Sequence, residues 1–306
     1  MPPVLDSVLG AIGATPLVEL RRLHPGPGRI LAKLDYLNPG GSKKDRIALR
    51  MIEEATADGR LGPGQTVVEL TSGNTGTGLA IVCAVTGHPF VAVMSRGNSD
   101  ERVTMMRALG AEVVLVDQSP GSQRGHVSGE DLARVEEVAA ALAVERRAFR
   151  ADQFRLEGNA RAHEDGTGEE LWAQSGGTID AFCEFVGTGG TLAGVARALK
   201  RHRPAIACYA VDPSRPDHRI QGGGYSMPEL PLLDPAVVDG RLAVTDDDAI
   251  AAARRLARLE GIFAGFSAGA NVAAAEVLLA GRHHGQTVAV VLADTGLKYL
   301  STDLWG

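Results

Sequence analysis

Two adjacent lysines, Lys43 and Lys44, follow the turn sequence Asn-Pro-Gly-Gly-Ser at residues 38–42. The residues after this turn predict a helix that begins at Lys44. The partial positive charge at a helix N-terminus disfavours an ammonium ion and therefore favours the neutral, nucleophilic amine. Such an amine can form a Schiff base with a carbonyl compound. A pair of solvated surface lysines is the alternative interpretation.

Two loops rich in glycine and hydroxyl residues follow the lysine pair. Residues 71–76 (Thr-Ser-Gly-Asn-Thr-Gly) and residues 187–191 (Gly-Thr-Gly-Gly-Thr) each stand between an apolar predicted strand and a predicted helix. Backbone N–H groups and hydroxyls at a helix N-terminus bind anions such as carboxylate or phosphate. The first loop matches neither the P-loop pattern nor the GxGxxG pattern. An ordinary strand-to-helix turn is the alternative for the first loop, and the motif of the second loop fits many nucleotide or phosphate sites.

A serine motif at residues 265–269 (Gly-Phe-Ser-Ala-Gly) matches the GxSxG pattern of α/β-hydrolases. That fold requires an acid and then a histidine later in the chain. Only His283 and His284 follow Ser267, and Glu276, the one acid between, lies on the same predicted helix as the serine. This spacing leaves no room for the intervening strands, so the hydrolase interpretation is rejected.

Short β-rich runs alternate with helical patterns along the chain. The predicted strands are residues 30–34, 66–70, 90–94, 112–116, 181–186, 205–211 and 287–292. The predicted helices are residues 44–57, 75–85, 99–109, 129–142, 159–174, 190–202, 246–259 and 268–279, and Thr245 is predicted to cap the seventh. Several strands are apolar at nearly every position, which is typical of strands covered on both faces. The alternation predicts an α/β fold with two open, largely parallel sheets.

The length of 306 residues suits about two domains. Residues 118–129, rich in Ser, Gly, Gln and Pro, are the best linker candidate. We therefore expect an N-terminal domain at residues 1–145 and a C-terminal domain at residues 146–306, with the site in the cleft between them. Residues 12–35 are expected to cross to the other domain.

The composition narrows the class of protein. Hydrophobic content of 44% and charged content of 22% are typical of a soluble globular protein. The net charge of -6 does not indicate the excess of basic residues that binding to nucleic acid or an anionic membrane requires. Cys83, Cys183 and Cys208 lack CxxC spacing, so we expect buried thiols and no metal site. No signal peptide or bilayer-spanning stretch is indicated, and a cytoplasmic location is expected.

The order and spacing of these motifs resemble the fold-type-II pyridoxal-phosphate enzymes of the cysteine synthase (O-acetylserine sulfhydrylase) and cystathionine β-synthase family. The resemblance covers nearly the whole chain. It is carried by residues 12–18, 38–46, 71–76, 101–102, 109–111, 153–154, 167–168, 187–191, 220–222, 265–270 and 294–302. It implies a tryptophan synthase β-like fold, pyridoxal 5′-phosphate as cofactor and a homodimer.

The resemblance also implies roles for individual residues. The family's Ser-x-Lys-Asp-Arg motif selects Lys44 as the catalytic, cofactor-carrying lysine. The other cofactor-binding residues implied are Asn74 at the ring hydroxyl, Gly187, Thr188, Gly189, Gly190 and Thr191 at the phosphate, and Ser267 at the pyridine nitrogen. The substrate carboxylate is implied to be held by Thr71, Ser72, Thr75 and Gln153. Lys43 occupies a position that is usually aliphatic, and we hypothesise that its ammonium lowers the pKa of Lys44.

The implied reaction is β-replacement on a β-substituted L-serine such as O-acetyl-L-serine, through an α-aminoacrylate, with Lys44 as general base. Sulfide is the simplest nucleophile and gives L-cysteine. Residues 155–159 lack the family's Asn-Pro turn, and the glycine loop at residues 222–225 is short. Homocysteine or another thiol, an amine or a hydroxylamine-type nucleophile are therefore alternatives. Serine or threonine ammonia-lyase activity and a non-catalytic relative are further alternatives. Arg215, His218 and Arg219 either contact an anionic co-substrate or are solvated loop residues.

Overall fold

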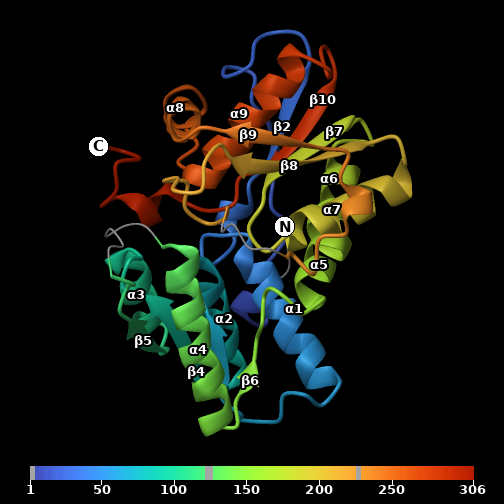
Figure 1. Ribbon diagram of the computed structural model, residues 1–306. Helices are drawn as coiled ribbons and strands as arrows, with labels where there is room; N and C mark the ends of the chain where they lie inside the picture. The colour runs from blue at the N-terminus through green and yellow to red at the C-terminus, as the bar shows by residue number, and fades with distance from the viewer. Residues whose placement is uncertain (1–3, 121–126, 225–228) are drawn as a thin grey trace.

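The computed structural model describes residues 4–120, 127–224 and 229–306, and it contains two β-sheets in separate lobes (Figure 1). In spatial order, the larger sheet consists of β1 (Leu17–Glu19), β2 (Arg29–Lys33), β10 (Thr287–Val291), β7 (Ala181–Phe185), β8 (Ala207–Pro213) and β9 (Gly240–Val244). The smaller sheet consists of β5 (Glu112–Val116), β4 (Phe90–Ser95), β3 (Val67–Leu70) and β6 (Phe149–Arg150). Every strand pair is parallel except β1 with β2. The predicted α/β fold with largely parallel sheets is confirmed.

Helices connect the strands and cover the sheets (Figure 1). The α-helices are α1 (Lys44–Ala57), α2 (Asn74–Thr86), α3 (Asp100–Ala108), α4 (Gly129–Glu145), α5 (Gly158–Ala162), α6 (Glu169–Gln174), α7 (Gly190–His202), α8 (Asp246–Arg255) and α9 (Phe266–Ala280). Short 3-10 helices lie at Val8–Ala11, Asp35–Leu37, Pro235–Val237 and Gly296–Tyr299. Strands β3, β4, β7 and β10 are buried at every residue, as expected of parallel strands with both faces covered. The carboxyl ends of β3 and β7 lead into the two glycine-rich loops, where open α/β sheets bind ligands.

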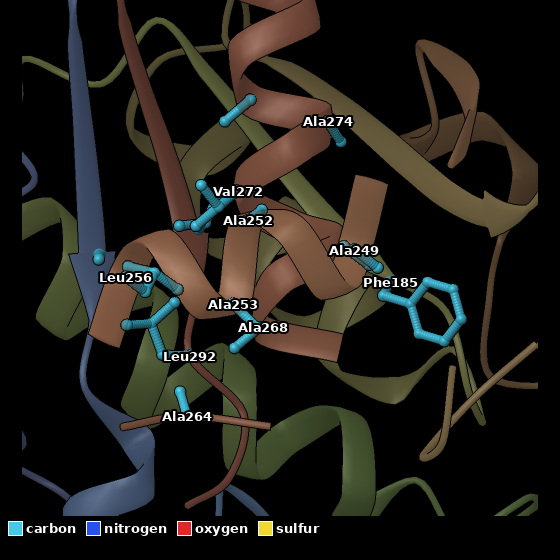
Figure 2. Packing of buried hydrophobic residues seen from close by; sticks show 14 of the residues in the cluster. Phe185, Ala249, Ala252, Ala253, Leu256, Ala264, Ala268, Val272, Ala274 and Leu292 are labelled. Carbon is cyan, nitrogen blue, oxygen red and sulfur yellow. The ribbon is translucent and has the colours of Figure 1, made fainter. Parts of the chain in front are cut away.

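Small side chains fix the position of α9, the helix that carries Ser267. Ala249, Ala252 and Ala253 of α8 are at most 2% exposed, and they face α9 across a tightly packed contact (Figure 2). A Cβ atom on Gly269 would lie only 2.0 Å from the carbonyl oxygen of Ala249. Such close approach is available only to small residues, and it holds the N-terminal turn of α9 in one place.

Some elements differ from the sequence predictions. Residues 159–174 form α5, a π-helix at His163–Gly168 and α6, because two glycines weaken the middle of the segment. A second π-helix, Leu256–Glu260, follows α8, whose predicted cap is confirmed by the bond from the backbone N–H of Asp248 to the Thr245 hydroxyl. The strands β1, β6 and β9 were not predicted.

The predicted domain division stays a prediction. Strand β6 follows the expected boundary at 145/146 and pairs with β3 of the smaller sheet, whereas β1 and β2 pair within the larger sheet. Residues 121–126 of the expected linker lie outside the described residues. Within the described part of the chain, no helix is long and apolar enough to cross a membrane.

Candidate active site

Lys44 lies where two adjoining cavities meet. The larger cavity is lined by Lys44, Leu70, Thr71, Ser72, Asn74, Thr75, Arg102, Leu132, Gln153, Phe154, Thr188 and Gly222. The smaller is lined by Lys43, Lys44, Glu184, Phe185, Val186, Gly187, Thr188, Gly189, Thr191, Leu192 and Gly222. The first loop, residues 71–76, therefore faces one cavity, and the second loop, residues 187–191, faces the other. The amine of Lys44 is open to both.

The environment of Lys44 favours its neutral amine. Its pKa is lowered from the usual 10.5 to about 7, chiefly because burial penalises the ammonium ion and next because Lys43 is a neighbouring cation. Glu184, Glu69 and Asp294 are anions that oppose this change. An amine with a pKa near neutrality is suited to nucleophilic and general-base chemistry.

Lys43 is a buried ion-pair partner and does not lie in solvent. Its Nζ contacts Oε1 of Glu184, which is the last but one residue of β7 and lies three positions before the second loop begins. The amide of Asn271, on α9, donates from Nδ2 to the other oxygen of Glu184 at 2.9 Å. Burial raises the pKa of Glu184, and the Lys43 ammonium opposes this rise. The alternative of two solvated surface lysines is excluded, because Lys43 is buried against Glu184 and Lys44 lines the cavities.

A buried threonine shapes the first loop. Oγ1 of Thr71 accepts hydrogen bonds from the backbone N–H groups of Gly73 and Gly76, each at 2.9 Å. Gly73 has φ +128°, and a Cβ atom there would lie 2.3 Å from Cδ of Arg102. Arg102 in turn donates from Nη1 to the carbonyl oxygen of Ser72 at 2.9 Å. The loop is thereby held in a conformation in which Thr71, Ser72, Asn74 and Thr75 line the cavity.

Gln153 joins the first loop to the second. Its Oε1 accepts a 2.6 Å hydrogen bond from the hydroxyl of Thr75, and its Nε2 donates to the carbonyl oxygen of Leu70. Nδ2 of Asn159 donates both to the Gln153 carbonyl at 2.7 Å and to Oγ1 of Thr188 at 2.9 Å.

The second loop has the geometry of an anion cradle at the N-terminus of α7. Gly189 has φ +85°, a left-handed conformation that favours glycine. A Cβ atom on Gly190 would lie 2.1 Å from Oδ1 of Asn159, so the backbone packs against the asparagine as only glycine allows. The hydroxyl of Thr191 contacts Nε2 of His163 at 3.1 Å, and burial, reinforced by nearby cations, lowers the pKa of this histidine well below its usual value.

Asn74 and Ser267 lie in the first turns of α2 and α9, and Asn74 lines the larger cavity. Asn74 is the first residue of α2, and its amide lies between the Asp294 carboxylate and the Lys298 ammonium, with hydrogen bonds of 2.7 Å to each. Ser267 is 7% exposed in the first turn of α9. A Cβ atom on Gly222, which lines both cavities, would lie 3.9 Å from the Ser267 hydroxyl oxygen.

The structure thus places most of the sequence-predicted residues in the lining of the two cavities that share Lys44, and Gly190 and Ser267 are the two that are absent from that described lining. The roles assigned to all of these residues stay predictions. Sequence reasoning missed four residues that line the cavities or contact their lining: Glu184, Arg102, Lys298 and Asp294. The sequence features that could have indicated Arg102, Asp294 and Lys298 are the family-resemblance blocks at residues 101–102 and 294–302, and Glu184 lies in none of these blocks. Arg215, His218 and Arg219 are absent from the described residues that line the two cavities; both arginines pair with Asp246.

Comparison with known proteins identifies the family. A model described as "Pyridoxal-phosphate dependent enzyme" matches residues 8–294. The chain belongs to this family. Like the other members, this pyridoxal-phosphate dependent enzyme uses pyridoxal phosphate as its cofactor, which confirms the cofactor prediction.

Similar proteins catalyse related chemistry under different names. Cysteine synthase of Staphylococcus aureus is 41% identical, over 98% of this chain and 97% of its own. O-ureido-L-serine synthase of Streptomyces lavendulae is 39% identical, over 99% and 93%. A crystal structure of O-ureido-L-serine synthase has a TM-score of 0.90 at 39% identity, covering 99% of this chain and 96% of that one. O-acetylserine sulfhydrylase isoform 3 of Entamoeba histolytica has a TM-score of 0.89 at 34% identity, covering 100% and 93%.

The residues present fit the cofactor of this pyridoxal-phosphate dependent enzyme. The smaller cavity offers an amine of lowered pKa and, at its other end, the backbone of the second loop at a helix N-terminus. A Cβ atom on Gly187 would come within 3.0 Å of the Gly222 carbonyl oxygen, so side chains are kept out of this space. A phosphate and an aldehyde at opposite ends of one ligand suit this arrangement.

Proposed function

We propose that this enzyme catalyses β-replacement on a β-substituted L-serine, such as O-acetyl-L-serine, and adds sulfide to give L-cysteine. The observation that carries the proposal is the position of Lys44, a residue of lowered pKa that lines two cavities, one with residues of the first loop and the other with residues of the second. The similarity to cysteine synthase over 98% of the chain supports the same reaction class.

Each loop has its own task in this proposal. Thr71, Ser72, Thr75 and Gln153 hold the substrate carboxylate, and the second loop, residues 187–191, holds the cofactor phosphate. Asn74 binds the cofactor's ring oxygen, and the Ser267 hydroxyl faces its pyridine nitrogen. A neutral hydroxyl does not enforce a protonated ring, which suits elimination and replacement better than transamination.

Proton movement is assigned to Lys44. When bound, pyridoxal phosphate supplies the electron sink that stabilises negative charge at the substrate α-carbon. The neutral amine of Lys44 removes the α-proton as general base, and the buried walls of the cavity limit access of water to that carbon. At pH values above about 7 the amine form predominates, because the ammonium form is destabilised by burial.

A second candidate shares the donor but differs in the nucleophile. Similarity to O-ureido-L-serine synthase, at a TM-score of 0.90, favours a hydroxylamine-type nucleophile in place of sulfide. The larger cavity carries an apolar wall from Leu70, Leu132 and Phe154, which accommodates a nucleophile bulkier than sulfide.

Competition between nucleophiles tests both candidates. The purified enzyme is given O-acetyl-L-serine with sulfide, homocysteine, hydroxyurea or no nucleophile, and the products are identified by mass spectrometry. The proposal predicts L-cysteine with the highest kcat/KM from sulfide. Preferred use of hydroxyurea selects the second candidate, and pyruvate without any nucleophile selects the ammonia-lyase alternative. Absence of every product contradicts the donor assignment.

We also propose a homodimer, an inference that depends on the family resemblance alone. Light scattering during size-exclusion chromatography is predicted to give twice the 32.0 kDa of one chain. A mass of 32.0 kDa at micromolar concentration contradicts it.

A further inference from the structure

The side-chain amide of Asn74 is held from both ends by the C-terminal segment. Nδ2 donates to Oδ2 of Asp294, and Oδ1 accepts from Nζ of Lys298, both at 2.7 Å. An ionised carboxylate can only accept hydrogen bonds and an ammonium can only donate them. The two partners therefore fix which end of the amide is nitrogen and which is oxygen.

Both partners are themselves buried and held in place. Asp294 is 0% exposed and accepts a second hydrogen bond, at 2.5 Å, from the hydroxyl of Tyr299. Lys298 is 1% exposed and also donates to the carbonyl oxygen of Gly40 at 2.8 Å. Burial lowers the pKa of Lys298 to about 8, and the Asp294 carboxylate opposes this change. Both side chains are buried, and each makes a hydrogen bond to the side-chain amide of Asn74.

The same segment is joined to the turn that carries Lys44. The backbone N–H of Lys43 donates to the carbonyl of Ala293 at 2.8 Å, and that of Thr295 donates to the carbonyl of Gly41 at 3.0 Å. An isolated β-bridge pairs Ser42 with Asp294. One short segment thus sets the position of the reactive amine and the orientation of the Asn74 amide together.

The orientation has a chemical consequence. One Nδ2 hydrogen of Asn74 is used by Asp294, so the other is the donor that remains, whereas Oδ1 already accepts from a cation. Polarisation by that cation makes the amide a better N–H donor and a poorer acceptor. Both an anionic ring oxygen and a ring hydroxyl can accept from this donor, but the hydrogen bond to the anion is the stronger, so the donor favours the ionised form.

We infer that Asp294 and Lys298 are positioning residues that fix the Asn74 amide, so that its free N–H stabilises the anionic ring oxygen of the cofactor. This inference rests on the proposed contact between Asn74 and that oxygen. No donor or nucleophile is needed to test it, so an error in the proposed reaction leaves the test valid.

The test is a double-mutant cycle on the holoenzyme, read from the absorbance of bound cofactor. The variants are Lys298→Met, Asn74→Ala and their combination, with Lys298→Arg as the conservative replacement. Lys200→Met, which removes an exposed cation paired with Asp239 at the far end of α7, is the matched control. The ratio of the yellow band to the near-ultraviolet band reports the ionised fraction of the ring oxygen, and fluorescence titration gives the cofactor Kd.

Lys298→Met is expected to lower that ratio and to raise the Kd, each by about tenfold, as for loss of a hydrogen bond to a charged group. Lys298→Arg restores most of the ratio, and Lys200→Met leaves it unchanged. In the Asn74→Ala background, Lys298→Met has no further effect, because its partner is absent.

Equal effects of Lys298→Met in both backgrounds would overturn the inference, since they would show that Lys298 acts without Asn74. A wild-type spectrum for Lys298→Met overturns it as well. If circular dichroism shows that Lys298→Met is unfolded, Asp294→Ala, which removes the acceptor for Nδ2 of Asn74, replaces it in the same cycle. An unchanged spectrum for Asp294→Ala then contradicts the inference, and a loss that depends on Asn74 supports it.

Discussion

Removing the positive charge of Lys43 is predicted to shift the reactivity of Lys44 to higher pH. The pKa of Lys44 is lowered by burial first and by Lys43 second, and it is raised by Glu184. Lys43→Met removes the cation and leaves the Glu184 carboxylate without its partner. Even if Glu184 then becomes neutral, the pKa of Lys44 rises, because the effect of Lys43 exceeds that of Glu184.

The size of the effect follows from the charges. Like charges 4 Å apart repel by about 4 kcal/mol near a protein surface. Because Glu184 opposes Lys43, we take the net change as smaller than this, about one pKa unit or about 1.4 kcal/mol. With a pKa of about 7, about half of Lys44 is neutral at pH 7, compared with about 0.03% at the usual 10.5. A rise of one unit leaves about 10% neutral, so the rate at pH 7 falls about fivefold.

The assay is stopped-flow absorbance of cofactor-free protein mixed with pyridoxal phosphate across a pH series. The midpoint of the rate profile is predicted to move up for Lys43→Met, to move down for Glu184→Gln and to stay near wild type for Lys43→Arg. Titration of the cofactor itself is common to all variants and cancels in the comparison. An unmoved midpoint for Lys43→Met, with native circular dichroism, refutes the hypothesis that Lys43 tunes Lys44.

Three further substitutions test the loops. Thr71→Val leaves two buried N–H groups without an acceptor. We therefore expect the free energy of unfolding in urea to fall by about 2 kcal/mol or more, and the KM of the amino-acid donor to rise. Gly73→Ala places a Cβ atom 2.3 Å from Arg102 at a backbone φ of +128°, so we expect the free energy of unfolding to fall by about 1–3 kcal/mol. A fall of less than about 0.5 kcal/mol, the size of a neutral surface change, contradicts this geometry. Gly190→Ala displaces Asn159 and is predicted to weaken cofactor binding by about tenfold or more in a fluorescence titration, and unchanged affinity would argue against the second loop as the phosphate site.

The main elements of the fold follow from local patterns. Helices α1 and α7 and strand β5 have the predicted limits, because a turn, a glycine loop or a change of period marks each end. The short strands β1, β6 and β9 carry little local signal, and each pairs with a neighbour that only the folded chain provides. The π-helical residues 163–168 interrupt a predicted helix whose periodicity alone did not reveal them.

The candidate site was predictable in its residue types but not in its pairings. The order of the motifs indicated Lys44, Asn74 and Ser267 through a family resemblance, and the structure places Lys44 and Asn74 in the lining of the cavities. The contacts from Lys43 to Glu184 and from Asn74 to Lys298 join residues 141 and 224 positions apart. No periodicity or spacing rule connects such distant side chains, so these partners emerge only from the packed structure.

The absorbance of the purified enzyme, before and after adding O-acetyl-L-serine, tests the central claim most directly. The account predicts a yellow holoenzyme whose band shifts when the donor is added without a nucleophile and returns when sulfide follows. Lys44→Ala, which retains the loops but lacks the base, is predicted to keep its fold by circular dichroism and to give no L-cysteine. A wild-type band that ignores the donor, or a Lys44→Ala variant that still turns over, contradicts the assignment of Lys44 as the base for β-replacement.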